Sequence, residues 1–210
     1  FDKLLKAFED SEEKFTDESS LMNEVIYIPG EIDNIKITYK EDIPMKEEIR
    51  SGTGFDAHRF SPDIAANNAI TLGGIKIPFE KKLEAHSDGD VLIHSLVDAI
   101  LGSIGAGDIG MHFPPSDIKW KNADSKLFLI HANELLKSKN GRINNIDITV
   151  ICEKPRLGKY REEIRNNLTD ILTINKDRIN IKATTTEKMG FTGREEGIAV
   201  QSICTVTLQL

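Results

Sequence analysis

The sequence predicts an α+β fold, a two-layer sandwich with a sheet on one side and helices on the other. Residues 198–208 place apolar side chains at every second position except Ser202, which indicates a half-buried strand. Residues 124–138 and 160–173 instead repeat apolar residues at helical spacing, which indicates helices against a core. Because such strands and helices are mixed along the chain, a sheet covered by helices on one face is expected.

The remaining elements follow from local signals. A strand is expected from about Ile49, and Gly73-Gly74 between two β-rich arms predicts a hairpin. Residues 89–103 read as a helix, the Gly/Pro-rich stretch 104–117 as a loop, and residues 146–152 and 178–184 as strands. The apolar stripes expected on the two later helices are Leu127, Ile130 and Leu135, and Ile164, Leu168, Ile171 and Leu172.

The charge divides the chain into two parts. Residues 1–50 hold 14 acidic and 7 basic residues, so they carry the whole net charge of −7. We therefore predict an acidic N-terminal extension at 1–48, disordered over about 8–20 with a short hairpin around Pro29-Gly30, and a catalytic domain at 49–210. Because Phe1 is not Met, we expect a fragment, from which a targeting segment could have been removed.

Composition narrows the class of protein. Hydrophobic residues at 39% and charged residues at 29% are typical of a globular protein. No apolar run approaches the ~20 residues of a membrane span, and no basic patch suggests a nucleic-acid partner. Cys152 and Cys204 lack C-x-x-C spacing and are expected to be buried free thiols.

The run G-T-G-F-D-A-H-R-F carries the most informative pattern. In a strand, Asp56 and His58 point the same way, and His94 in the helix of 89–103 offers a third ligand. An Asp/His/His set suits zinc, and three protein ligands leave a fourth position for a substrate. Asp98, one turn beyond His94, is expected to support a ligand imidazole.

The stretch A-H-S-D-G-D precedes this helix. Ser87 and Asp90 have the spacing of a capping box, and a helix N-terminus attracts phosphate. On these residues alone, Ser87 is better explained as a simple cap. We expect His131 to lie on the surface and do not assign His112 as a ligand.

Three long segments resemble the 2-C-methyl-D-erythritol 2,4-cyclodiphosphate synthase family. They are G-T-G-F-D-A-H-R-F, the run from A-H-S-D-G-D to M-H-F-P, and K-A-T-T-T-E-K-M-G-F-T-G-R-E-E-G-I-A-V. The resemblance implies a homotrimer with its sheets around the three-fold axis. It also implies conversion of 4-diphosphocytidyl-2-C-methyl-D-erythritol 2-phosphate to the 2,4-cyclodiphosphate and CMP, in non-mevalonate isoprenoid biosynthesis.

The resemblance also implies roles for individual residues. Zinc would be held by Asp56, His58 and His94, and Mg²⁺ or Mn²⁺ by Glu187. His86 and Ser87 would contact the substrate phosphates, and Thr185 the α-phosphate. The nucleotide pocket would be formed by Cys152, Glu153, Lys154, Pro155, Arg156, Ala183, Thr184 and Thr185, with Asp108 and Gly110 at the ribose.

Two further regions match family features. Residues 113–125 resemble a mobile flap, in which Pro115 replaces a commonly acidic residue. Phe55, Phe191, Arg194 and Glu196 match the lining of a cavity on the trimer axis, a possible site for an isoprenoid diphosphate. The alternative for Arg194 is an intersubunit salt bridge with Glu195 or Glu196.

Two other functions compete with the synthase. One is a zinc phosphohydrolase that activates water with the same ligands on a nucleoside diphosphate conjugate. The other is a non-catalytic nucleotide-binding trimer. Lys, Ile and Asn usage, together with the N-terminal extension, suggests a plastid-type organelle (apicoplast or chloroplast), with a bacterial cytoplasm as the alternative.

Overall fold

The structure is a computed structural model of the chain. It describes residues 2–11, 25–26, 28–31, 34–39, 46–64, 68–85, 88–114, 116–120 and 123–210. The chain divides into two compact units, Phe1–Pro44 and Met45–Leu210, so the division falls four residues before the predicted boundary. No helix of the described residues is long and apolar enough to cross a membrane.

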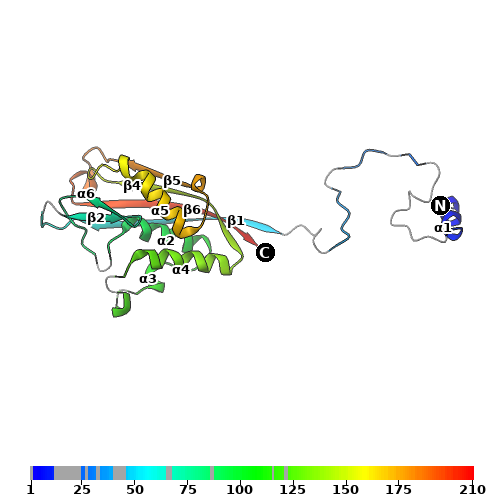
Figure 1. Cartoon of the computed structure of the whole chain (residues 1–210), viewed down its shortest axis with the longest axis horizontal. Coiled ribbons are helices and arrows are strands. Elements are labelled where there is room, and N and C mark those ends of the chain that lie inside the picture. Colours follow the sequence, from blue (N-terminus) through cyan, green and yellow to red (C-terminus); the bar gives the residue numbers. More distant parts are fainter. Residues whose placement is uncertain are drawn as a thin grey trace. The chain divides into compact units, whose positions relative to one another are not determined.

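The second unit is the α+β structure that the sequence predicts (Figure 1). Its strands are β1 (Glu47–Arg59), β2 (Ala69–Leu72), β3 (Ile75–Pro78), β4 (Gly141–Ile151), β5 (Ile179–Thr184) and β6 (Gly197–Gln209). Its helices are α2 (Val91–Ser103), α3 (Ile109–His112), α4 (Ser125–Ser138), α5 (Arg161–Leu172) and α6 (Gly190–Gly193). Short 3-10 turns span Ile118–Trp120, Gly158–Tyr160 and Lys176–Arg178.

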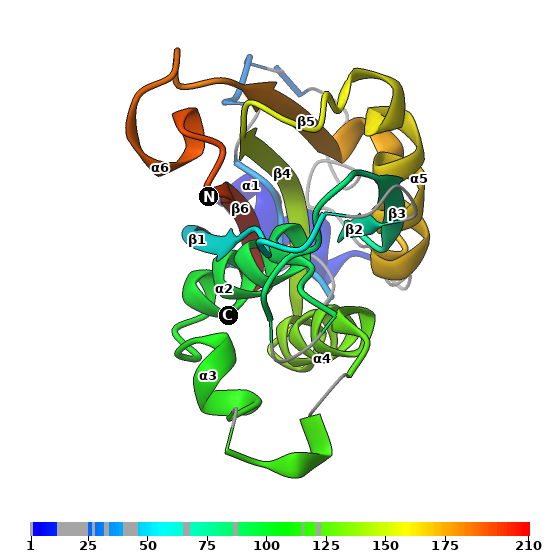
Figure 2. The same ribbon diagram turned by 90° about the vertical axis from the view of Figure 1, so that its left-hand side faces the viewer.

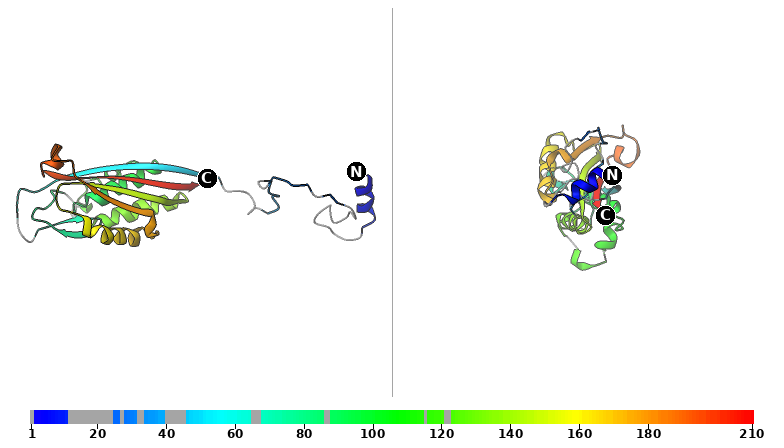
Figure 3. Two further views of the ribbon diagram at one scale, coloured as in Figure 1. Left: turned by 90° about the horizontal axis from the view of Figure 1, so that it is seen from above. Right: turned by 90° about the vertical axis from the view of Figure 1, so that its right-hand side faces the viewer.

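The main sheet is mixed, with strand order β1-β6-β4-β5. Strand β6 runs antiparallel to both β1 and β4, whereas β4 and β5 are parallel. Strands β2 and β3 form the separate hairpin expected around Gly73-Gly74. Figure 2 views the sandwich from the end at which β4 and β5 finish, and Figure 3 shows β1 and β6 side by side with the helices along the other side.

Two glycines bring helix α2 unusually close to strand β1. A methyl group on Gly54 would lie 1.8 Å from the carbonyl oxygen of Ser95, and one on Gly52 would lie 2.1 Å from that of Ala99. Nothing larger than hydrogen fits at either position. The helix also joins β6, because the hydroxyls of Ser95 and Ser202 are 2.7 Å apart. The position of helix α2 relative to strands β1 and β6 is therefore fixed.

Helix α2 begins later than predicted, and Asp90 caps it. The Asp90 side chain accepts hydrogen bonds from the backbone N–H groups of Ile93 at 3.0 Å, Gly73 at 2.9 Å and Gly74 at 2.6 Å. One buried carboxylate thus closes the helix and fixes the β2–β3 turn. The capping box expected from Ser87 is not the arrangement at this terminus, and Ser87 itself lies outside the described residues.

Helices α4 and α5 complete the covering layer. Helix α5 buries Ile164, Leu168 and Leu172, as its periodicity predicts. The stripe predicted for α4 is confirmed only in part, because Leu135 packs against the core but Leu127 is 54% exposed. The buried apolar residues of α4 are Phe128, Leu129, Ala132 and Leu136. The helix is therefore rotated relative to the prediction, since Phe128 belongs to an aromatic cluster with Phe113 and Trp120.

The first unit has one helix among its described residues, α1 (Asp2–Glu9). The expected disorder over residues 8–20 is not seen at residues 8 and 9, which end this helix, and most of that stretch lies outside the described residues. The hairpin expected around Pro29-Gly30 is wrong for the part that the structure describes, because residues 25–26, 28–31 and 34–39 contain no strand.

Candidate metal and nucleotide site

The three predicted metal ligands lie together. Strand β1 presents Asp56 and His58 on one face, and the first turn of α2 brings His94 to them. Asp56 Oδ2 lies 3.1 Å from His58 Nε2 and 3.0 Å from His94 Nδ1. One ligand atom from each residue lies within 4.8 Å of the other two. The three side chains come together because α2 packs closely against β1 at Gly52 and Gly54.

Each imidazole is oriented by its second nitrogen. His58 Nδ1 lies 2.9 Å from the carbonyl oxygen of Glu84, which can only accept, so this nitrogen carries the proton. His94 Nε2 lies 2.8 Å from the hydroxyl oxygen of Ser125. Hydrogen bonds on the far nitrogens leave His58 Nε2 and His94 Nδ1 directed at Asp56, as is usual around metal-bound histidines.

The electrostatics of the cluster follow from this contact. Burial opposes ionisation of Asp56, but the hydrogen bonds and positive charge of His58 and His94 outweigh it and lower its pKa. The hydrogen bond to Asp56 raises the pKa of His58, against the effect of burial. The carboxylate is therefore ionised at neutral pH and supplies the negative charge that a cation needs.

The donor set fits a divalent metal ion. Ligands about 2.0–2.1 Å from a tetrahedral zinc ion lie roughly 3.3 Å apart, close to the 3.0 and 3.1 Å found here. Three protein ligands leave one position open, which is the arrangement of catalytic rather than structural zinc sites. Glu187 is not in this group, which is the one found among the described residues.

Asp98 has a different partner from the one expected. Its carboxylate accepts a hydrogen bond of 2.7 Å from the backbone N–H of Ile109, at the start of α3. Sequence reasoning missed Ser125, which occupies the expected position beside His94, and Asp88, which accepts the Ser125 hydroxyl. A serine at the start of a helix gives no signal of such a role, because it reads as part of a cap.

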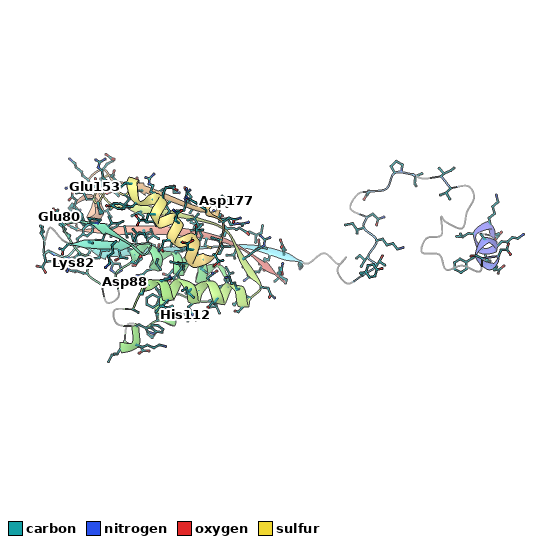
Figure 4. The ribbon with its side chains drawn as sticks, viewed as in Figure 1. Glu80, Lys82, Asp88, His112, Glu153 and Asp177 are labelled. Carbon is teal, nitrogen blue, oxygen red and sulfur yellow. The ribbon has the colours of Figure 1, made fainter. Side chains whose placement is uncertain are left out.

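The predicted nucleotide residues leave two parallel strands at neighbouring ends. Ile151 of β4 pairs with Thr184 of β5, and the backbone N–H of Cys152 donates to Thr184 O at 3.1 Å. Cys152 is buried, as expected, and burial raises the pKa of its thiol to about 11. The set from Cys152 to Arg156 therefore lies beside Ala183–Thr185 at one sheet end, where Figure 4 shows Glu153.

Glu153 holds the turn that carries Glu187. Its Oε1 accepts from the backbone N–H groups of Thr186 and Lys188, each at 3.2 Å. Thr185 Oγ1 donates to Glu187 Oε1 at 2.8 Å. Glu187 and Lys188 both have positive φ, 51° and 63°, a conformation that costs free energy at non-glycine residues and recurs at functional sites. Lys154 lies 3.3 Å from Glu195.

The remaining predicted residues lie elsewhere in the second unit or outside the described residues. Asp108 caps the short helix α3, which contains Gly110, by accepting from Met111 N at 2.9 Å. His112 and His131, neither of which is a predicted ligand, lie 3.2 Å apart between Nδ1 and Nε2. His86, Ser87 and Pro115 lie outside the described residues.

The residues predicted for an axial cavity lie on the uncovered side of the sheet. Phe55 is 59% and Phe191 41% exposed. Arg194 pairs with Glu196 of the same chain, with Nε to Oε1 at 2.8 Å and Nη2 to Oε2 at 3.3 Å. Within the described residues Arg194 therefore already has the counter-ion that was expected from a neighbouring subunit.

The fold and the site define an α+β protein with a candidate three-ligand metal centre formed by strand β1 and helix α2. A model of the YgbB family matches residues 49–207, so the chain belongs to the YgbB family. The resemblance to 2-C-methyl-D-erythritol 2,4-cyclodiphosphate synthases is confirmed, because solved structures of that name match most of this chain.

Three similar proteins illustrate the match. A bifunctional enzyme IspD/IspF of Bartonella bacilliformis is 50% identical over 216 residues, which cover 96% of this chain and 53% of that protein. IspF of Plasmodium falciparum in complex with CDP is 35% identical, with a TM-score of 0.67 over 77% of this chain and 97% of that one. The synthase of Plasmodium vivax is 29% identical, with a TM-score of 0.65 over 78% and 100%.

The chain spans about half the length of the curated relatives that it matches. Further bifunctional IspD/IspF relatives, 44–48% identical, are also bacterial. Their alignments to this chain include most of its first unit as well as the YgbB unit.

Proposed function

We propose that this chain converts 4-diphosphocytidyl-2-C-methyl-D-erythritol 2-phosphate to 2-C-methyl-D-erythritol 2,4-cyclodiphosphate and CMP. An oxygen of the 2-phosphate forms a bond to the β-phosphorus, and the bond from that phosphorus to the bridging oxygen breaks, so that CMP leaves with the bridging oxygen. The observation that carries the proposal is the Asp56/His58/His94 cluster in a YgbB fold. Such a reaction needs positioning and charge neutralisation rather than a covalent enzyme intermediate.

Zinc is the metal that this donor set favours, because one carboxylate and two imidazoles suit a borderline ion. Bound zinc would hold and polarise a phosphate oxygen of the substrate. Glu187 is proposed to hold Mg²⁺ or Mn²⁺, with Thr185 beside it at the α-phosphate, and their 2.8 Å hydrogen bond supports a joint role. His86 and Ser87 remain proposed phosphate contacts.

The cytidine is proposed to bind where β4 and β5 end, between the 152–156 segment and Ala183–Thr185. Support comes from the paired strand ends and from the P. falciparum relative solved with CDP. Asp108 and Gly110 are proposed to hold the ribose, because Asp108 lies on an exposed turn with one carboxylate oxygen that accepts from Met111.

The active site is proposed to form between subunits of a homotrimer. The Asp56/His58/His94 group of the described residues does not include Glu187, and we propose that Glu187 completes the site from a neighbouring subunit. The sheet face opposite the helices also carries Ile49 at 70%, Phe55 at 59% and Ile203 at 39% exposed. An apolar sheet face of this kind is typical of a surface that another subunit covers.

Three finer proposals accompany the reaction. An isoprenoid diphosphate in the axial cavity would compete with Glu196 for Arg194. A bacterial cytoplasm is favoured over a plastid-type organelle, because the curated relatives at 44–50% identity are bacterial. The chain is proposed to supply the IspF part of a longer protein with two activities.

Phosphorus NMR of the products tests the function. The synthase predicts a cyclic diphosphate and CMP in equal amounts, whereas the zinc phosphohydrolase alternative predicts a non-cyclic phosphate product. The His58→Ala variant should produce neither product and should bind no zinc. Release of a non-cyclic phosphate product by the unmodified chain would refute the synthase proposal.

Subunit mixing tests the shared site. His58→Ala chains are mixed with Thr185→Val/Glu187→Ala chains under conditions that exchange subunits, each variant being inactive alone. Sites between subunits predict partial recovery of activity, because some interfaces then combine two intact halves. A mixture that remains inactive after verified exchange would contradict the shared site.

A further inference from the structure

Ser125 and Asp88 form a closed hydrogen-bond chain behind His94. Asp88 accepts the Ser125 hydroxyl at Oδ1 and the Ser125 backbone N–H at Oδ2, the latter at 2.9 Å. The same hydroxyl oxygen lies 2.8 Å from His94 Nε2. Ser125 is fully buried, and the three residues come from the start of α4, the segment before α2, and α2 itself. Figure 4 shows where Asp88 lies.

The hydrogens available to Asp88, Ser125 and His94 allow one arrangement of these hydrogen bonds. A serine hydroxyl has one hydrogen, and an ionised carboxylate can only accept, so the Ser125 hydrogen is directed to Asp88. The hydroxyl then offers a lone pair to His94, and Nε2 of the imidazole must donate. Because Nε2 keeps its proton, Nδ1 is the nitrogen whose lone pair becomes available to a metal ion; without metal, Nδ1 donates to the ionised Asp56 carboxylate 3.0 Å away.

We infer that Ser125 and Asp88 are positioning residues that hold His94 in its metal-binding tautomer. The inference rests on the proposed function, since it takes His94 as a ligand. Ser125 is the first residue of α4, directly after the 113–124 segment, and the two bonds to Asp88 fix it in place. The orientation of His94 is therefore set where this segment returns to the core.

Asp88→Asn distinguishes this role from simple support of a helix terminus. Asp88 accepts two backbone N–H groups, that of Ser125 at Oδ2 (2.9 Å) and that of Asp90 at Oδ1 (3.2 Å). We expect the amide oxygen of asparagine to keep the shorter bond, to Ser125, so that the amide NH₂ faces the hydroxyl and donates to it. The hydroxyl hydrogen then turns toward His94 Nε2, which must become the acceptor. The proton of the neutral ring is then confined to Nδ1, so the nitrogen that faces the metal has no free lone pair.

The experiment measures tautomer and metal affinity separately. In the metal-free full chain, ¹⁵N NMR of the imidazoles should show a proton on Nε2 of His94 in the unmodified protein and no proton on Nε2 in Asp88→Asn. Zinc affinity, measured by competition with a chromogenic chelator, should fall about 10- to 100-fold in Asp88→Asn and in Ser125→Ala. Ser103→Ala is the matched control, because it removes a buried hydroxyl that donates only to Ile100 O and should leave affinity unchanged.

The outcomes separate the proposed metal site from the positioning role of Ser125 and Asp88. Failure of the unmodified chain to bind one zinc, or full zinc binding by His58→Ala, would refute the proposed metal site. If the unmodified chain binds one zinc normally, the positioning role alone would be overturned by a folded Asp88→Asn variant that keeps both the zinc affinity and the Nε2 proton of His94. If Ser125→Ala does not fold, Asp88→Asn decides, because it retains the hydroxyl, the helix start and nearly the same volume.

Discussion

Replacing Gly54 by alanine should separate helix α2 from strand β1 and dismantle the metal centre. The new methyl group would lie 1.8 Å from Ser95 O and 2.9 Å from Ala99 N, both backbone atoms that cannot move alone. Ordinary contact begins near 3.4 Å, so the helix must retreat by about 1.6 Å. His94, next to Ser95, would withdraw from Asp56 by a similar amount, starting from the present 3.0 Å.

The Gly54→Ala substitution should lower both the stability of the protein and its zinc affinity. Overpacking against backbone should lower the free energy of unfolding by about 3 kcal/mol, which for a chain of this size lowers the melting temperature by roughly 6–12 °C. Zinc affinity should fall at least about tenfold, because a ligand displaced by more than 1 Å cannot reach the ion. Calorimetry of the metal-free chain and chelator competition measure the two effects.

Gly102→Ala provides the control on the same helix. Its methyl group would meet no atom closer than 3.9 Å, and alanine in a helix is favoured over glycine by about 0.5–1 kcal/mol. This variant should therefore melt slightly higher and bind zinc normally. A Gly54→Ala protein with the melting temperature and zinc affinity of the unmodified chain would refute the link between glycine packing and the site.

Three further predictions concern other parts of the second unit. Asp90→Asn should lower the free energy of unfolding, measured by denaturant titration, by about 2–3 kcal/mol, because one amide oxygen cannot accept from the N–H groups of Gly73, Gly74 and Ile93. Asp124→Asn, at an exposed helix cap, is the control and should change this free energy by under about 0.5 kcal/mol. Cys152 and Cys204 should resist iodoacetamide at pH 8 in the native chain and react after unfolding, because burial raises their thiol pKa values to about 11 and about 12. Rapid labelling of either thiol in the native chain would contradict this prediction. Glu187→Gln should retain zinc but weaken the dependence of activity on added Mg²⁺ or Mn²⁺, and an unchanged metal titration would remove Glu187 from the site.

Local sequence signals predicted most elements of the second unit. Period-two alternation located β6, the Gly73-Gly74 pair located the hairpin, and helical periodicity located α4 and α5. The same alternation correctly predicted that Asp56 and His58 share one face of β1. These features were readable because each depends on residues only a few positions apart.

The face of α4 and the start of α2 were decided by distant contacts. Helical spacing alone allowed Leu127 to face the core, but the cluster with Phe113 and Trp120 turned Phe128 inward instead. The spacing of Ser87 and Asp90 suggested a capping box, whereas the β2–β3 turn drew the Asp90 carboxylate to Gly73 and Gly74. Neither partner lies within the helix concerned.

The sequence by itself therefore determined which residues are able to bind metal, through residue type and strand alternation. The tertiary structure decided how those residues are oriented. His94 reaches Asp56, 38 positions away, because two glycines let α2 approach β1. Its proton is placed by Ser125, 31 positions further along, and Ser125 in turn by Asp88 across 37 positions. No periodicity connects such positions, since only the packing of α2 against β1 and α4 brings them within hydrogen-bond distance.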